Sequence, residues 1–212
     1  MTKSFDILIV GIGGQGTILA SNILGEACIL EGRHVKGAET HGMAQRGGSV
    51  ETHIRIDGQY GPLIVPGTAD ILISFDLLEA LRYSHYLKTG GRMVVNRHMV
   101  LPTSVFTQKS PVPTEDEIVA QLARFNPCLI DADKIATDAG SSLSQNVVIL
   151  GAASLSIPLK AESLLAAVKK LVPSKTVEVN AKAFEMGRAF SRIRCRDHWA
   201  HSDRMPGTRG CT

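Results

Sequence analysis

Two glycine-rich segments near the start of the chain contain the residue types that could bind a ligand. The first, residues 11–16, reads GIGGQG and fits the pattern G-x-G-x-x-G. Glycines at this spacing allow a tight turn and let backbone N–H groups approach a pyrophosphate at a helix N-terminus. The same glycines could serve only to pack a helix closely on a strand, and the pattern does not decide between the two interpretations.

The second segment, residues 39–49, reads ETHGMAQRGGS. Gly47 and Gly48 could present consecutive backbone N–H groups to an anion, and Arg46 adds a fork of donors for phosphate or carboxylate. His41 could carry a proton beside that anion. A surface loop with Arg46 in an ordinary salt bridge is the alternative. The candidate cofactor-binding or partner-facing residues are Gly11, Gly13, Gly14, Gln15, Gly16, His41, Gln45, Arg46, Gly47, Gly48 and Ser49.

A dinucleotide site would also need an acidic residue at the end of the second strand, to hold a ribose hydroxyl. Glu31 precedes that strand, and Glu39 is better placed but lies inside the second glycine-rich segment. The sequence contains no G-x-S-x-G nucleophile motif, no Walker lysine after Gly16 and no H-E-x-x-H motif. It therefore identifies no catalytic residue and no metal site.

The elements that would position these segments alternate between strand and helix. Residues 5–10 have the apolar pattern of a buried strand, and residues 17–30 have helical periodicity that ends near Gly32. Residues 34–38 form a weak second strand and residues 49–56 alternate as a half-buried strand. Asp57 and Gly58 then predict a hairpin turn into a return strand at residues 60–65.

The remainder of the chain predicts further α/β units and three closing helices. Strands are expected at residues 71–75, 93–96 and 128–131, a turn at Gly90 and Gly91, and helices at 77–86, 114–125, 146–156, 161–171 and 177–190. The predicted fold is a single Rossmann-like α/β domain over residues 4–190, with a mostly parallel sheet, an inserted β-hairpin and helices on both faces. Residues 191–212 are expected to be a flexible basic tail.

Composition excludes several classes of protein. Among the 212 residues 44% are hydrophobic and 20% charged, which is typical of a globular domain whose core needs no disulfide. The net charge of +3 matches the five arginines and two aspartates of residues 192–212, so the rest is neutral and lacks the basic stripe of a nucleic-acid-binding protein. The four cysteines form no C-x-x-C pair, which argues against a locally wrapped cluster or zinc. Asp6 interrupts the first apolar run, which argues against a signal peptide. The longest later apolar stretch, residues 147–159, contains two serines and is too short to span a bilayer, so we expect a cytoplasmic location.

The sequence resembles the γ-type subunits of the 2-oxoacid:ferredoxin oxidoreductase family, in particular the β subunits of the indolepyruvate enzymes. The motifs that carry the resemblance are GIGGQG, HGMAQRGGSV (41–50), GPLIVPGTADILISFDLLEALR (61–82), NVVILGAA (146–153) and VNAKAFEMG (179–187). HGMAQRGGSV is specific, whereas the glycine turn alone is not. The similarity spans residues 4–190 and leaves the tail unexplained.

The resemblance implies a division of labour between subunits. A larger partner would hold thiamine diphosphate and iron–sulfur clusters, and the complex would decarboxylate an arylpyruvate such as indolepyruvate, form an acyl-CoA and reduce ferredoxin. This chain would bind no cofactor alone, be inactive alone, and pack on that partner, with Arg46, Gly47 and Gly48 facing either a coenzyme A phosphate or the partner. The alternatives are a free-standing NAD(P)-dependent dehydrogenase and a pure interaction module.

Overall fold

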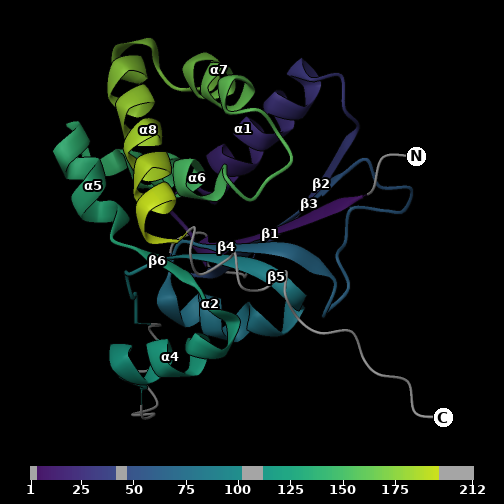
Figure 1. Cartoon of the computed structure of the whole chain (residues 1–212), viewed down its shortest axis with the longest axis vertical. Coiled ribbons are helices and arrows are strands. Elements are labelled where there is room, and N and C mark those ends of the chain that lie inside the picture. Colours follow the sequence, from purple (N-terminus) through teal and green to yellow (C-terminus); the bar gives the residue numbers. More distant parts are fainter. Residues whose placement is uncertain (1–3, 42–46, 102–111, 196–212) are drawn as a thin grey trace.

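The computed structural model describes residues 4–41, 47–101 and 112–195, which form a six-stranded sheet between two layers of helices (Figure 1). The strand order is β2-β3-β1-β4-β5-β6. β3 runs antiparallel to both of its neighbours, and the other pairings are parallel. The strands are β1 (Phe5–Ile12), β2 (Val35–His41), β3 (Ser49–Ile56), β4 (Ala69–Ser74), β5 (Leu87–Asn96) and β6 (Cys128–Ile130).

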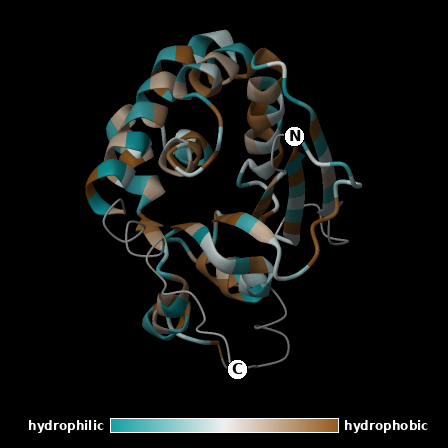
Figure 2. Cartoon of the chain, turned by 45° about the vertical axis from the view of Figure 1, so that its right-hand side comes forward, coloured by the Kyte–Doolittle hydropathy of each residue, from teal (hydrophilic) through white to brown (hydrophobic). Residues whose placement is uncertain are grey.

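Helices cover both faces of this sheet. Figure 1 shows α1 (Thr17–Leu30), α5 (Ala132–Ala139), α6 (Gln145–Ala153), α7 (Ala161–Leu171) and α8 (Val177–Arg194) above the sheet, with α2 (Leu77–Tyr83) and α4 (Glu115–Leu122) below it. Single 3-10 turns lie at Ser84–Tyr86, Ala123–Phe125, Ser142–Ser144 and Ser174–Thr176. Figure 2 shows the helices banded with hydrophobic and hydrophilic residues, as expected when one side packs on a sheet.

Alternation along the strands divides the interior into two hydrophobic cores. On β1, Ile7 and Ile9 face the larger core, which α1, α5, α6, α7 and α8 complete. Leu8 and Val10 face the smaller core, which α2 and α4 complete. All four of these side chains are fully buried, because β1 is central and covered on both faces.

Most of the predicted elements are confirmed. The strand at 49–56 and the helices at 17–30 and 161–171 have the predicted bounds. Gly32 follows α1 with φ at 66°, as a residue that ends a helix. Thr114 forms a capping box with Glu117 at the start of α4. The inserted hairpin is also present, but β2 and β3 make it.

The predicted return strand after Asp57 and Gly58 is wrong, since residues 60–65 form no strand. The Asp57 carboxylate instead accepts hydrogen bonds from Arg33 Nε (3.0 Å) and the His34 backbone N–H (3.1 Å). β3 is already paired on both sides, by β1 and β2, so no free edge remains for a further strand.

Other predicted elements differ from the structure in their bounds, and one helix was not predicted. Gly90 and Gly91 lie inside β5, where the pairing with β4 shifts register, and do not form a turn. The sequence did not predict α5, an eight-residue helix that Asp131 caps by accepting from the Lys134 N–H. α8 ends at Arg194, beyond the predicted end at residue 190, and residues 196–212 lie outside the described part of the chain.

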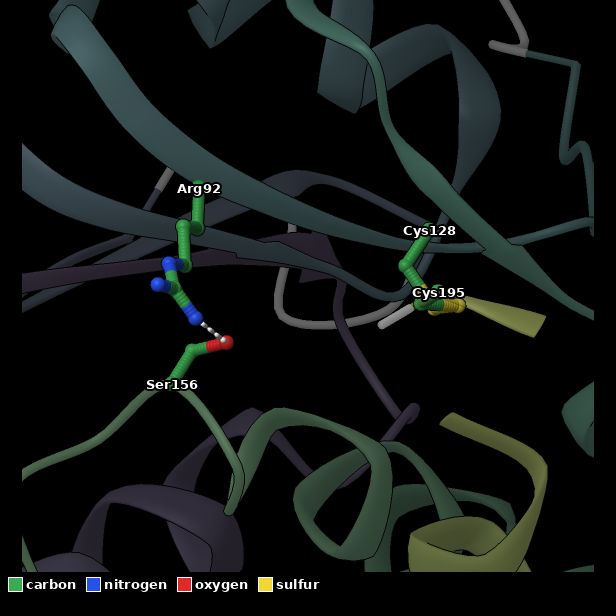
Figure 3. Close-up of a disulfide and its surroundings, with 4 residues drawn as sticks. All are labelled: Arg92, Cys128, Ser156 and Cys195. Carbon is green, nitrogen blue, oxygen red and sulfur yellow. Dashed lines mark hydrogen bonds between the residues drawn. A yellow bond between two sulfur atoms is a disulfide. The ribbon is translucent and has the colours of Figure 1, made fainter. Parts of the chain in front are cut away.

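A disulfide joins Cys128, the first residue of β6, to Cys195 after the end of α8 (Figure 3). The two Cα atoms are 5.4 Å apart, across 67 residues of sequence. The sequence predicted a core that needs no disulfide, and it did not predict this link. The pairing of the two cysteines depends on the return of α8 to the sheet, which local sequence does not show. Elsewhere on this side of the sheet, Arg92 Nη1 donates to Ser156 Oγ at 3.5 Å, which connects β5 to the segment after α6 (Figure 3).

Within the described residues, none of the helices combines the length and the apolar composition needed to cross a bilayer.

Candidate functional site

The candidate site lies where the chain leaves the carboxyl ends of β1 and β4. These two strands are parallel neighbours, yet α1 and α2 that follow them pack on opposite faces of the sheet. In open α/β sheets, ligands bind outside the carboxyl ends of the strands at such a switch point. The Phe75 N–H donates to the Val10 carbonyl (2.9 Å), so the two strands stay paired up to their carboxyl ends.

The first glycine-rich segment forms the turn from β1 into α1. Gly14 and Gly16 have φ values of 104° and 84°, a conformation that other residues rarely adopt. A Cβ atom on Gly16 would lie 2.5 Å from Nδ2 of Asn146 on α6. The side-chain oxygen of Gln15 closes the turn by accepting from the Ile12 N–H at 2.7 Å. The prediction that these glycines permit a tight turn is therefore confirmed.

Gly16, the N-cap residue of α1, has no side chain to cap the helix, and the first turn contains no acidic residue. Backbone N–H groups of a first helical turn lack partners within their own helix and can bind an anion. The buried Nε2 atom of Gln15 has no hydrogen-bond partner within the described residues.

The second glycine-rich segment meets the first one directly. The Gly13 N–H donates to the Gly48 carbonyl at 2.9 Å, and Ser49 pairs with Ile12 in the β1–β3 ladder. Gly11, Gly13, Gly14, Gln15, Gly16, Gly47, Gly48 and Ser49 are thus brought to one edge of the sheet. Gln45, Arg46 and the His41 side chain lie outside the described part, although the His41 backbone ends β2 opposite Val50.

Two buried polar residues at this edge, Asp76 and Asn96, are not among the predicted site residues. Asp76, fully buried, caps α2 by accepting from the N–H groups of Leu78 (2.8 Å) and Glu79 (3.2 Å) and also accepts from Val100 (2.7 Å). Burial raises the pKa of Asp76, and these backbone donors partly oppose the rise. Asn96, also fully buried, accepts from the Ala132 N–H at 3.0 Å. Both residues stand at the end of an apolar run, which is the signal that could have revealed them.

A third missed residue is Glu79, on the first turn of α2. Its side chain is 1% exposed and accepts a hydrogen bond from the Ser49 hydroxyl. Burial is the main cause that raises the pKa of Glu79, and the Ser49 hydrogen bond and Arg82 oppose the rise. Glu79 thus connects α2 to the residue that follows Gly48.

The position of Glu39 is unlike that of the ribose-binding acid in a dinucleotide fold. Glu39 lies on β2, which β3 separates from β1, and accepts from Ser21 Oγ at 3.1 Å. An acid on the strand next to β1 would be needed beside the glycine turn. Among the described residues, no group of three or more His, Cys, Asp or Glu side chains could hold a metal ion.

The family model named pyruvate ferredoxin/flavodoxin oxidoreductase matches residues 6–190, which include both glycine-rich segments and every helix from α1 to most of α8. The chain belongs to this family. The matched range nearly coincides with the predicted domain of residues 4–190.

Named relatives lie within the same family. The chain is 41% identical over 186 residues to the indolepyruvate oxidoreductase subunit IorB of Archaeoglobus fulgidus, which covers 86% of this chain and 92% of that one. It is 32% identical over 184 residues to the pyruvate/ketoisovalerate oxidoreductases common subunit gamma of Pyrococcus abyssi, covering 82% and 89%. The crystal structure of a keto/oxoacid ferredoxin oxidoreductase gamma subunit from Geobacter sulfurreducens superposes with a TM-score of 0.67 at 28% identity, covering 89% and 99%. The γ-type resemblance inferred from the motifs is therefore confirmed.

Proposed function

We propose that this chain is a subunit of a 2-oxoacid:ferredoxin oxidoreductase that acts on arylpyruvates such as indolepyruvate. The complex releases CO2 from the 2-oxoacid, transfers the acyl group to coenzyme A and passes the electrons to ferredoxin. The support for this proposal is membership of the family and an identity of 41% with a subunit named for indolepyruvate. The same relatives give no support to a free-standing NAD(P)-dependent dehydrogenase.

The partner is proposed to be a larger subunit that holds thiamine diphosphate and the iron–sulfur clusters. These groups supply the decarboxylation and the electron transfer when bound there. The sequence of this chain agrees with that division, because its four cysteines are widely spaced and form no C-x-x-C pair. The chain is then inactive alone and binds no cofactor of its own.

The role proposed for this chain is to help dock coenzyme A at the joined glycine-rich segments. The observation that carries this role is the hydrogen bond from Gly13 to Gly48, which creates one surface from both segments beside the uncapped N-terminus of α1. Backbone N–H groups at a helix N-terminus favour phosphate, and Arg46 lies next to Gly47 in sequence. The unpartnered Gln15 Nε2 adds a further donor at the same turn.

The test begins with anaerobic purification of the tagged chain from its native host. We expect a large partner that contains iron and thiamine diphosphate, and dye reduction that needs both indolepyruvate and coenzyme A. In the purified complex Arg46→Ala should raise the KM for coenzyme A about tenfold or more, since a hydrogen bond to a charged group is lost. Arg124→Ala removes an arginine from the 3-10 turn before β6, which contributes no residue to the candidate site; it is the matched control and should leave that KM unchanged. An iron-free protein without partner that binds NADH would contradict the proposal.

A further inference from the structure

The buried carboxylate of Glu79 on α2 contacts the end of the second glycine-rich segment. Glu79 Oε2 accepts from the Ser49 hydroxyl, and Tyr83 Oη lies 3.3 Å from the same hydroxyl oxygen. Glu79 Oε1 makes no hydrogen bond within the described residues, and its countercharge is Arg82, whose Nε is 3.4 Å away on a half-exposed side chain. The carboxylate therefore has few partners for a group that is 1% exposed.

An apolar residue would be the ordinary choice at this position. The neighbouring inward positions of α2, Leu77 and Ala80, are fully buried and apolar. A buried carboxylate is destabilising unless hydrogen bonds compensate for its lost hydration. The hydrogen bond that Glu79 does make goes to Ser49, the first residue of β3.

That hydrogen bond completes a two-sided attachment of the loop before β3. On one side the Gly48 carbonyl accepts from Gly13 in the β1 turn, and on the other Ser49 donates to Glu79 on α2. α2 is itself fixed, because Asp76 accepts from two N–H groups of its first turn and from Val100. The backbone at Gly48 is thus located by β1 and by α2 at once.

A line of polar side chains on β3 continues this attachment into the interior. His53, 2% exposed, accepts from the Ile64 N–H through Nδ1 at 3.2 Å. Its proton is therefore on Nε2, which lies 3.7 Å from Glu51 Oε1. Glu51 in turn interacts with the Tyr83 hydroxyl. Alternate residues of β3 thus share one polar face with Tyr83 and Glu79.

We propose that Glu79 is a positioning residue for the Gly47–Gly48 segment, acting through the Ser49 hydroxyl. The role concerns this chain's own backbone and rests on the proposed function only in naming coenzyme A as the molecule the segment meets. Glu79 and Ser49 act as a unit, so removing either one breaks the hydrogen bond between them, while the bond of Gly48 to Gly13 remains. In a Glu79 variant Tyr83 Oη still lies beside the Ser49 hydroxyl, but the carboxylate that orients this hydroxyl is gone.

The experiment measures two quantities in the same variants. Amide hydrogen exchange of residues 47–49 is followed in the full chain, and the KM values for coenzyme A and for the 2-oxoacid are measured in the complex with its partner. Ser49→Ala and Glu79→Leu should each speed exchange, and raise the KM for coenzyme A, by about tenfold. The kcat and the KM for the 2-oxoacid should stay within about twofold of the unmodified complex. The double variant should be no worse than either single one.

Two further variants separate positioning from general loss of structure. Glu79→Gln should restore slow exchange and the KM for coenzyme A, because its amide oxygen still accepts from Ser49. Glu26 is another paired glutamate: it lies on α1 and its carboxylate accepts from Lys170 Nζ at 2.6 Å. Glu26→Leu removes this pair and should change neither the exchange rate nor the KM for coenzyme A. A thermal melt of each variant checks folding, and Ser49→Ala, which deletes only one hydroxyl, keeps the test valid if Glu79→Leu is unstable.

The outcomes distinguish this inference from the function on which it draws. Faster exchange with an unchanged KM for coenzyme A would support positioning by Glu79 and contradict coenzyme A docking at this segment. Unchanged exchange in both Ser49→Ala and Glu79→Leu would overturn the positioning role, whatever the kinetics. Exchange that is equally fast in Glu79→Gln and Glu79→Leu would also overturn it.

Discussion

The backbone N–H of Gly13 donates to the carbonyl of Gly48 at 2.9 Å, and this bond makes two distant glycine-rich segments into one surface. It follows from the antiparallel placement of β3 against β1, which sets Ser49 opposite Ile12 and so puts the preceding residue beside the turn. A parallel neighbour would have brought the other end of β3 to this edge. The inserted hairpin is thus what supplies the second half of the candidate site.

The conformation of Gly16 makes it intolerant of a side chain. Gly16→Ala should lower the free energy of unfolding by roughly 2–4 kcal/mol, because an alanine would have to adopt a left-handed φ and its Cβ would collide with Asn146. Gly25→Ala is the matched control, since its Cβ would meet nothing within 4 Å on helix α1. That variant should be more stable by about 0.5–1 kcal/mol. Urea unfolding measures both, and equal effects of the same sign would refute the assignment.

The Asp76 carboxylate accepts hydrogen bonds from three backbone N–H groups. Its removal should therefore destabilise both the start of α2 and the segment at Val100. We expect Asp76→Ala to destabilise the fold by about 2–4 kcal/mol, as a lost helix cap plus a buried N–H without a partner. Thr114→Ala removes the exposed cap of α4 and should cost less. The comparison uses chemical unfolding. If Asp76→Ala lowers the free energy of unfolding by less than Thr114→Ala does, the burial of the Asp76 carboxylate does not strengthen its role as a cap.

The titration of Glu79 predicts a particular pH dependence of stability. Burial raises its pKa in the native state, so between the ordinary and the raised pKa the native protein binds more protons than the unfolded chain. The free energy of unfolding therefore falls as the pH rises through that window. Glu79→Gln has no such proton and should gain stability relative to the unmodified protein on going from near pH 4 to near pH 7. Asp76, whose pKa is also raised, is present in both proteins and itself contributes to the raised pKa of Glu79. Urea unfolding at both pH values gives the difference, and a constant difference would contradict it.

The disulfide between Cys128 and Cys195 should contribute measurably to stability. Closing a loop across 67 residues restricts the unfolded chain, and reduction should lower the free energy of unfolding by roughly 2–4 kcal/mol. Urea unfolding with and without a thiol reductant measures this loss. The double variant Cys128→Ser, Cys195→Ser should unfold identically in both conditions. If alkylation and mass measurement show the same number of thiols before and after reduction, the link is absent in solution.

Local patterns were enough to predict much of the fold. The apolar run of β1, the glycine turn and the periodicity of α1 lie next to one another, so nearby residues determine them. The prediction at Asp57 and Gly58 failed for a long-range reason, because β1 occupies the edge that a return strand would need. The missed helix α5 is short and follows Asp131, which the sequence shows only as one of two nearby carboxylates.

The candidate site was predicted in part for the same reason. Both glycine-rich segments were visible as motifs, and their contact required only that β3 pair with β1. Glu79 could not be singled out, because it reads as an ordinary charged residue of an amphipathic helix. Its burial depends on where α2 packs, and its partner Ser49 is 30 residues earlier in the chain.

The two hydrophobic cores are completed at different times during synthesis of the chain. The buried members of the smaller core end with Leu122 on α4, whereas the larger core needs Phe184 on α8. A nascent chain that has already made all six strands therefore still carries Ile7 and Ile9 on an incompletely covered sheet face. Such exposed apolar surface promotes aggregation. Translation that stops before α8 should thus yield a chaperone client, because only the last helix completes the cover over this face of the sheet.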